Sequence, residues 1–544
     1  MKNGVPRSTD QPSLDRLPLA ASVRGVGVNL ALLSLGALLF AGAFPNPLFV
    51  DGLAPLGFLA LIPVVPVIRR SGWIGIWFYG IFYGFVTYAV FNYWLANFHP
   101  LAIFIVPVIY AGYFFVLFPI LKLATLLFPR NAYLVQAAIW IAYELLRTKG
   151  YLGYAYGIIG YSQYRVTPLI QIADFGGVWI VSLLVILPSL YLGQGLAGGL
   201  PGLRGFFKDH RRFPLVYLVL IIASLVYGFL APVDLSGTRQ WKVAMVQQNV
   251  DPWVGGFRAY EASLDALIRQ SDLALEEEPD IVVWSETSFV PAIDFHTRYR
   301  EDQETYELVR RLTDYLAGID VPVVVGNGDG QLVRNEEGEF ERVDYNAVLV
   351  HDDQEFSEPY RKIHLVPFTE HFPYERQFPW LHQLLVENNT TFWREGEEWT
   401  VFEAGGVRFS TPICFEDTFG YLSRGFVNRG AEVIVNLTND SWAYSVPSAM
   451  QHMGMAVFRA VENRRTVVRS TNGGMTTTID PNGRIRAMLP AFVEAYMVDT
   501  VPVFTDRTTI YTRFGDYFAY LHLFAAAGLL IYGSVVALLG RRYH

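Results

Sequence analysis

Cys414 is the only cysteine among the 544 residues of the chain, and two acidic residues follow it closely. It ends a short apolar run, 407–413, which predicts a β-strand, so the thiol stands where a strand meets a loop. A single cysteine forms no disulfide within its own chain and no multi-cysteine metal site. A thiol beside carboxylates at a strand end is a candidate nucleophile. The alternative is a small buried hydrophobic residue, the usual role of a free cysteine.

Two other residues near strand ends or loops suit acyl transfer. Glu286 follows the apolar run 281–284, where partial burial raises a carboxyl pKa and favours a general base. Lys362 precedes an apolar stretch that ends at Glu370. A base that removes the thiol proton and a cation that stabilises an oxyanion would complete the chemistry of a cysteine nucleophile. Taken singly, a surface acid and a solvated basic turn are the more ordinary interpretations.

The elements that must position these residues lie between 240 and 505, where short β-rich runs alternate with helical stretches. Strands alternating with helices predict an α/β domain in which helices cover the sheet, with reactive groups at strand ends. Helices are predicted over 258–276, 301–318 and 448–463. The predicted strands are 241–250, 281–286, 321–326, 347–351, 408–414, 433–439 and 466–470.

Long apolar runs flank this domain on both sides. The chain is 52% hydrophobic with only 17% charged residues, and the apolar residues concentrate before about 232 and after about 517. Runs of this length predict membrane-spanning helices. We therefore expect a multi-span α-helical membrane bundle of about eight spans, near 26–43, 53–68, 73–95, 101–127, 132–147, 173–197, 213–231 and 517–540.

Basic residues predict the orientation of these spans. With eight spans, most arginines and lysines near the span ends fall on one side, which should be cytoplasmic. The α/β domain then faces out, which in a bacterium means the periplasm. The expected division is a cytoplasmic tail 1–25, a seven-span membrane domain 26–232, a catalytic domain 240–505, a final span 517–540 and a cytoplasmic tail 541–544.

The remaining composition narrows the function. A net charge of −8 argues against nucleic acid as a partner. The sequence contains no glycine-rich phosphate loop and no metal-ligand spacing, so we expect no metal and no cofactor. Glu144 lies one helical turn from Arg147 beside a predicted span, which favours a structural ion pair at the membrane interface.

The ordered combination of motifs resembles a known family. Glu286 in Trp-Ser-Glu-Thr, Lys362 in Tyr-Arg-Lys-Ile-His-Leu-Val-Pro-Phe and Cys414 in Ile-Cys-Phe-Glu-Asp resemble the Glu-Lys-Cys triad of the nitrilase superfamily. The flanking spans narrow the resemblance to its membrane-embedded branch, bacterial apolipoprotein N-acyltransferase, and imply an α-β-β-α sandwich. Further similar stretches are 93–94, 171–177, 345–346, 436–442, 451–462, 469–474 and 479–483.

The resemblance implies a ping-pong reaction at the inner membrane without a cofactor. Glu286 would deprotonate Cys414, whose thiolate attacks the sn-1 ester of a phospholipid, typically phosphatidylethanolamine, while Lys362 stabilises the oxyanion. A thioester acyl-enzyme would then pass its acyl chain to the α-amino group of the S-diacylglyceryl cysteine of an apolipoprotein. The implied partners are this donor, this acceptor and the lipid bilayer, and the implied oligomeric state is a monomer.

Other positions take roles from the same resemblance. The implied supporting residues are Glu370, Glu416, Phe415 and Asn439, and the implied substrate-binding residues are Trp253, Trp442, Phe372 and Trp380. The chain departs from the family pattern at Ser285, Thr369, Phe415 and Ala443-Tyr444, and Thr369 puts in doubt the backbone geometry of the loop that carries Glu370.

The stretch 372–393, which contains Phe372 and Trp380, is more apolar than a solvated connection requires. A lid that dips towards lipid and a loop packed on the domain's own core are both open interpretations.

Two alternative functions remain. A membrane-tethered amidase would keep the triad and use water as the second nucleophile, although a soluble amide substrate needs no membrane bundle. A transporter or receptor with a degenerate outer domain predicts the loss of a triad residue, and all three are present.

Overall fold

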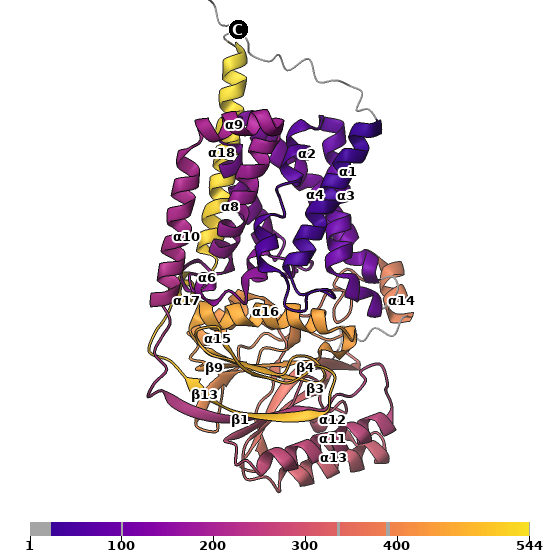
Figure 1. Cartoon of the computed structure of the whole chain (residues 1–544). Helices are drawn as coiled ribbons and strands as arrows, with labels where there is room; N and C mark the ends of the chain where they lie inside the picture. The colour runs from indigo at the N-terminus through magenta and orange to yellow at the C-terminus, as the bar shows by residue number, and fades with distance from the viewer. Residues whose placement is uncertain (1–22, 99–101, 335–337, 388–391, 543–544) are drawn as a thin grey trace, which may run out of the picture.

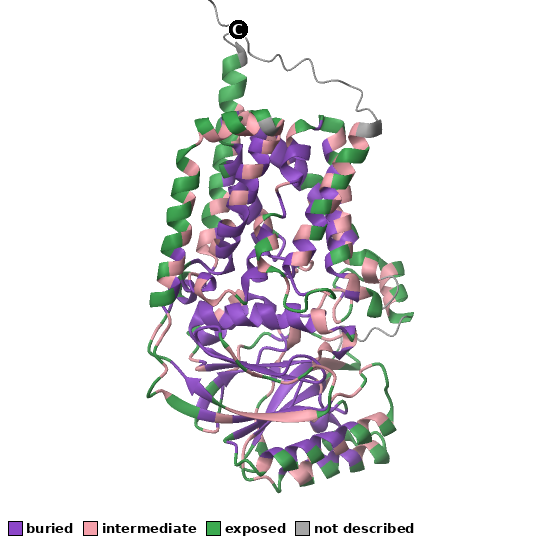
Figure 2. Ribbon diagram, in the orientation of Figure 1, coloured by how far each residue is buried: buried purple, intermediate pink, exposed green. Residues whose placement is uncertain are grey.

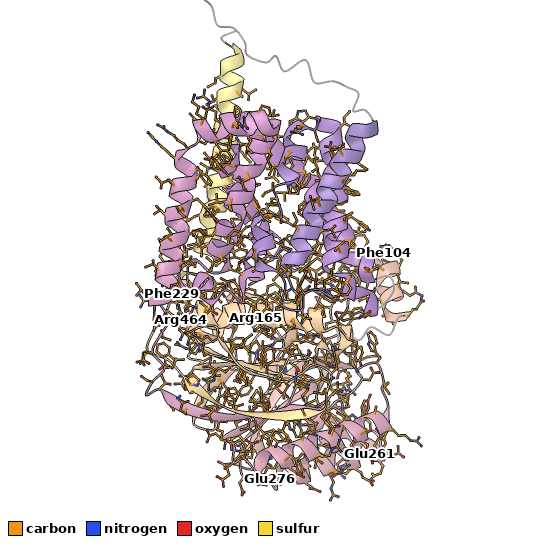
Figure 3. All side chains as sticks on the ribbon, viewed as in Figure 1. Phe104, Arg165, Phe229, Glu261, Glu276 and Arg464 are labelled. Carbon is orange, nitrogen blue, oxygen red and sulfur yellow. The ribbon has the colours of Figure 1, made fainter. Side chains whose placement is uncertain are left out.

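The computed structural model describes residues 23–98, 102–334, 338–387 and 392–542, which form a helical bundle stacked on an α/β domain (Figure 1). Most of the expected amino-terminal tail and residues 543–544 of the carboxyl-terminal tail lie outside these ranges. Phe104 and Phe229 point outward from the bundle, whereas Glu261 and Glu276 mark the far side of the α/β domain (Figure 3).

Six helices of the described chain are long and apolar enough to cross a membrane. One shorter apolar helix, α5 (Ala132–Leu146), packs among them. Figure 2 shows α8 largely buried inside the bundle, whereas α10 and α18 expose most of their residues. The six are α1 (Val23–Ala43), α3 (Trp73–Phe91), α4 (Ala102–Leu127), α8 (Val178–Leu196), α10 (Arg212–Leu230) and α18 (Tyr517–Arg542).

The segment predicted as a span over 53–68 is not a continuous helix. It consists of a 3₁₀ turn, η1 (Ala54–Phe58), further turns, and the short helix α2 (Val64–Arg70), because its prolines interrupt helical hydrogen bonding. Bundle side chains bind its exposed carbonyls: Gln163 donates to Ala54 O at 2.9 Å and Ser189 donates to Phe58 O. Irregular backbone is tolerated at membrane depth only where protein satisfies it in this way.

The prediction for 173–197 also needs a correction. This stretch is divided at Gly177, whose φ of +65° lies in the left-handed region, into a short α7 (Ala173–Gly176) and α8. With α5 and the broken 53–70 segment, the six long helices make up the expected bundle of about eight segments. The chain is a multi-pass membrane protein.

The expected Glu144–Arg147 ion pair does not form. Glu144 accepts hydrogen bonds from Trp140 Nε1 and the Ile159 amide. Arg147 instead donates to the Tyr110 hydroxyl and to the carbonyls of Tyr154 and Tyr156. Residues one helical turn apart can each bind other partners when the surrounding loops supply them.

Basic residues gather at the end of the bundle away from the α/β domain. Arg70 donates to Ala197 O at 2.7 Å, and Gln194 binds Arg130 O at 2.8 Å. The amphipathic helix α9 (Gly199–Asp209), which carries Arg204 and Lys208, lies across the same end (Figure 1). This grouping matches the positive side that the sequence predicts.

The α/β domain contains two stacked sheets. The first sheet has the order β13-β1-β2-β3-β4-β5, and β6 also pairs with β4. Within it, β2 (Ile281–Val283) runs parallel to both of its neighbours, β1 (Arg239–Gln247) and β3 (Val323–Arg334). The second has the order β12-β11-β10-β9-β8-β7. The remaining strands are β4 (Phe340–Asp352), β5 (Glu355–Phe356), β6 (Tyr360–Arg361), β7 (Phe402–Ala404), β8 (Val407–Ser410), β9 (Val433–Thr438), β10 (Thr466–Thr471), β11 (Thr477–Ile479), β12 (Ile485–Met488) and β13 (Ala495–Val503).

Side-chain alternation along these strands builds three apolar layers. Val243 and Met245 face the second sheet, while Ala244 and Val246 face helices α11 (Phe257–Leu275) and α13 (Gln303–Leu316). The outer face of the second sheet packs against α15 (Gly420–Asn428) and α16 (Val446–Asn463). The order helix, sheet, sheet, helix confirms the expected α-β-β-α sandwich.

Helix α16 forms most of the joint with the bundle (Figures 1 and 2). Arg464, at its carboxyl end, pairs with the buried Asp174 at 2.7 Å, and Arg507 reaches the same carboxylate at 3.2 Å. Glu462 accepts from the Val178 amide at the start of α8. Figure 3 places Arg464 at the level where bundle and domain meet. Asp174, Glu462 and Arg464 are buried and each is bonded across the joint, which ties the α/β domain firmly to the bundle.

Candidate active site

Cys414 begins a 3₁₀ turn, η4 (Cys414–Thr418), on the loop that follows β8. Its φ of +49° is unusual for a residue with a side chain, and such strain is stored at functional sites. Asn436 at the neighbouring β9 holds the turn, because its Nδ2 donates to the carbonyls of Pro412 and Cys414 at 3.0 and 3.2 Å. The thiol is half-buried at the domain face that turns towards the bundle.

Glu286 lies three residues beyond β2, and only 5% of it is exposed. Its Oε1 accepts from Asn346 at 2.9 Å and faces Lys362 Nζ at 3.3 Å. Its Oε2 is buried and, within the described chain, has no hydrogen-bond partner. One carboxylate oxygen is therefore oriented and the other is free to accept a proton.

Lys362 is fully buried directly after β6. Its Nζ lies between two carboxylates, 3.3 Å from Glu286 Oε1 and 2.8 Å from Glu370 Oε1. The backbone fixes it too, because its amide donates to Asn346 O at 2.8 Å. A buried cation held on two carboxylates is pre-oriented to stabilise an anion formed beside it.

The three groups shift one another's pKa values. Burial raises the pKa of Cys414, and the charge of Glu286 raises it further, whereas Lys362 lowers it. Burial likewise raises the pKa of Glu286 against the opposing charge of Lys362. Burial alone would lower the pKa of Lys362, but Glu370 and Glu286 raise it overall. The resting site thus holds a protonated thiol, a nearby base of increased basicity and a permanent cation.

Glu416 joins the lysine segment to the cysteine turn. Its Oε1 accepts from the amides of Ile363 and His364 at 2.8 and 2.9 Å, and its Oε2 accepts from the Ile413 amide at 2.7 Å. The Tyr360 hydroxyl donates to the same carboxylate. Burial raises the pKa of Glu416 to about 6, while the backbone donors oppose that shift. One carboxylate therefore sets the relative position of Lys362 and Cys414.

Glu370 closes a tight turn beneath Lys362. Its Oε2 accepts from the Val366 amide at 2.7 Å, while its Oε1 holds the lysine. Phe368 in this turn has a φ of +66°, so the turn forms although Thr369 stands at its tip. Tyr151, from the bundle, bridges the turn by accepting from the Phe368 amide and donating to His371 O, both at 2.9 Å.

The other expected site residues divide into those near the thiol and those away from it. Phe415 is buried against Phe419 and, across the joint, against Tyr154, with ring centroids 5.0 and 6.3 Å apart. Asn439 does not contact the triad; it caps the turn η5 (Asp440–Ala443) and binds Asn472. Trp253 and Trp442 meet edge to face at 4.9 Å on a loop surface.

The stretch 372–393 contains a buried aromatic residue, as a packed loop requires, and an exposed one, as a lid towards lipid requires. Phe372 is buried among the rings of Tyr151 and Phe368. Trp380 is exposed on α14 (Pro379–Glu387), a helix without buried residues that lies beside the domain-facing end of the bundle (Figure 1).

A buried ionic network adjoins the cysteine turn, and its residues lie in stretches that resemble the family, although the sequence assigned them no role. His452 on α16 lies 2.8 Å from both Asp417 and Asp440, and Arg469 pairs with Asp417. Burial opposes charge on His452, but Asp417 and Asp440 raise its pKa to about 9. This imidazolium locks the end of η4 to η5. In the part of the chain that is described, no three His, Cys, Asp or Glu side chains could hold a metal ion.

The arrangement supports acyl transfer through a thiol. Asn346, to which the sequence assigned no role, completes it by orienting Glu286. It lies in the stretch 345–346 that resembles the family, but its role follows only from its neighbours in space.

Comparisons with known proteins cover both the bundle and the α/β domain. Residues 35–191 match the apolipoprotein N-acyltransferase N-terminal domain, and residues 242–508 match carbon-nitrogen hydrolase. Apolipoprotein N-acyltransferase 1 of Treponema denticola is 40% identical over 91% of this chain and 94% of its own length. Its counterpart in Treponema pallidum is 42% identical over 93% and 95%.

Among solved structures, an amidase from Nesterenkonia is 18% identical and covers 49% of this chain and 91% of its own, with a TM-score of 0.34. The two Treponema relatives span nearly the whole chain, bundle included. The chain therefore belongs to the apolipoprotein N-acyltransferase family, within the nitrilase superfamily.

Proposed function

We propose that this protein transfers an acyl chain from a phospholipid to the α-amino group of the S-diacylglyceryl cysteine of apolipoproteins. The observation that carries the proposal is the buried group of Glu286, Lys362 and Cys414, in a domain whose cysteine turn faces a membrane bundle. The names of the Treponema relatives support the same acceptor class.

In the first half-reaction, the free Oε2 of Glu286 takes the thiol proton as Cys414 attacks the sn-1 ester carbon. Lys362 stabilises the oxyanion of the tetrahedral intermediate. The intermediate collapses to a thioester, and the leaving alkoxide takes the proton from Glu286 to give a lysophospholipid. Phosphatidylethanolamine is the donor we expect.

In the second half-reaction, the acceptor amine attacks the thioester carbon. Glu286 takes the amine proton, the Cys414 thiolate leaves, and the proton returns to sulfur. The product is an amide, and the enzyme is restored. Glu370 and Glu416 act as positioning residues. Glu370 binds Lys362, and Glu416 joins the lysine segment to the cysteine turn, and neither takes part in bond making or proton transfer.

We place the enzyme as a monomer in the bacterial inner membrane with residues 240–505 in the periplasm. The grouping of Arg70, Arg130 and helix α9 at the far end of the bundle supports this orientation. Both substrates keep their acyl chains in the bilayer, so a thiol at the joint meets them at headgroup level. Phe415, Trp253, Trp442, Phe372 and Trp380 are the side chains we expect to contact them.

The test is incubation of the purified protein with phospholipid and a diacylated lipopeptide. The proposal predicts N-acylated lipopeptide and lysophospholipid in equal amounts, without net fatty-acid release. Release of fatty acid or ammonia alone would instead indicate a membrane-tethered amidase that uses water as the second nucleophile.

A further inference from the structure

A groove of about 800 Å³ lies directly behind the lysine segment, between β4 and residues 392–398. Arg361 and His371 line it, and they are the immediate neighbours of Lys362 and Glu370. Residues 392–398, which form the opposite wall, are bonded to Lys362 and Glu370 themselves. The Gly396 amide donates to Lys362 O and the Trp393 amide donates to Glu370 O, both at 2.8 Å. Only one layer of backbone separates the groove from the triad.

One wall of this groove is an open strand edge. Strand β4 pairs with β3 along its whole length, and its other edge is covered by β6 at Ala347 and Val348 and by β5 beyond. Within the described ranges, no strand covers that edge at 340–343. On this side, the backbone amides of Lys362 and Arg394 donate to Asn346 O and Asp344 O. Since alternate residues point their main-chain groups to the same edge, the N–H and C=O of Arg342 also face the groove.

Most side chains that line the groove are charged, and both signs are present beside a few apolar and aromatic groups, which suits a hydrated ligand rather than an acyl chain. An extended polypeptide can add to a free strand edge through its main chain, with side chains contacting the walls. The charged lining residues are the three arginines Arg342, Arg361 and Arg394 and the five acids Glu341, Asp344, Glu395, Glu397 and Glu398.

We propose that this groove binds the polypeptide that follows the lipid-bearing cysteine of the acceptor, as a strand added to the edge of β4. The inference rests on the proposed function and adds the location of the acceptor chain. The acceptor must bring its α-amino group to Cys414 while its lipid stays in the bilayer and its polypeptide leaves towards water. Main-chain pairing accepts any side-chain sequence, so it places the chain without restricting which lipoprotein enters.

The test compares two changes at one position in the full-length protein. Arg342→Pro removes the N–H that faces the groove while leaving the β3 ladder, because the N–H of residue 342 points away from β3. Arg342→Ala is its reference, since it removes the side chain and keeps the N–H. The probes are a diacylglyceryl-cysteine dipeptide and a diacylglyceryl-cysteine decapeptide.

We expect the ratio of KM for the decapeptide to KM for the dipeptide to be about tenfold higher in Arg342→Pro than in Arg342→Ala. Acyl-enzyme formation from phospholipid reports that both variants fold. Equal ratios in two folded variants would overturn the inference.

A second measurement avoids substitution. A photo-reactive residue placed four to six positions after the lipidated cysteine should crosslink the wild-type protein within 340–344 or 392–398. Crosslinks confined to other segments would reject the groove. If wild-type protein acylates neither probe, the proposed function fails; if it acylates the dipeptide alone or crosslinks elsewhere, only the groove fails.

Discussion

The two segments that meet at the active site are attached to the bundle very differently. The cysteine turn rests on α16, which is bonded to the bundle through buried ion pairs such as Asp174–Arg464. The lysine segment reaches the bundle through the hydroxyl of Tyr151 and continues into α14, a helix with no buried residue. The cysteine turn is thus tied to the bundle through α16, whereas the turn that follows Lys362 meets the bundle mainly at Tyr151; Lys362 itself is buried and joined to the cysteine turn through Glu416. Substrate exchange is expected to move that turn and α14.

Among the changes that test this difference, Lys362→Met should have the largest effect, because it keeps the volume of the side chain and removes the cation. Two buried carboxylates would lose the cation that they share, and no charge would stabilise the oxyanion. We expect acyl-enzyme formation to fall by about 10²- to 10³-fold. Rapid-quench thioester assays measure this rate, and retention of a tenth of wild-type activity would contradict the assigned role.

Asp174→Asn tests the fixed side. The change leaves Arg464 and Arg507 without their shared carboxylate inside the joint, and breaking a buried pair costs about 3–5 kcal/mol. We expect a clear drop in Tm in detergent and, at low temperature, nearly unchanged thioester formation. The matched control is Asp265→Asn, which breaks the exposed ion pair between Asp265 and Arg311 and should leave Tm almost unaltered.

The His452 network gives the fixed side a pH dependence. Its folded pKa of about 9 lies above the ordinary 6.5, so its contribution is fully present below pH 6.5 and is lost as pH rises through about 9. The linked free energy is on the order of 3 kcal/mol. Wild-type Tm should therefore fall between pH 7 and 10, and His452→Gln should start lower and fall less. If Tm falls equally with pH in the wild type and in His452→Gln, His452 does not cause the pH dependence.

Tyr151→Phe tests the loosely held side and should have the smallest effect. It keeps the ring contacts with Phe368 and Phe372 but removes two hydrogen bonds, each worth about 1 kcal/mol. We expect faster hydrogen exchange in 363–371, faster alkylation of Cys414 and a loss in kcat of up to tenfold, with Tm within a degree or two. A Tm loss as large as that of Asp174→Asn would mean that both sides are equally fixed.

The sequence predicted the grouping of Glu286, Lys362 and Cys414 better than the residues that support them. Alternating strands and helices predicted the α/β domain, whereas the grouping followed from the resemblance of the three motifs, in order, to a known triad, because each residue taken singly had a more ordinary interpretation. Strand β13 escaped prediction because its exposed face reduces the apolar signal. The break at 53–70 escaped because hydropathy records apolar content and not the prolines that interrupt the helix, and because Gln163 and Ser189, which bind the freed carbonyls, come from distant parts of the chain. Asn346 and His452 lie in stretches that the resemblance marked, 345–346 and 451–462, but their roles could be assigned only from their neighbours in space.

The central claim is that Cys414 carries the acyl chain, and peptide mass spectrometry of protein incubated with phospholipid tests it most directly. We predict one fatty-acyl mass on the peptide that contains Cys414, removable by hydroxylamine and discharged by a diacylated lipopeptide, and none in Cys414→Ala. Acylation at another residue, or a Cys414→Ala protein that still transfers acyl chains, would contradict the account.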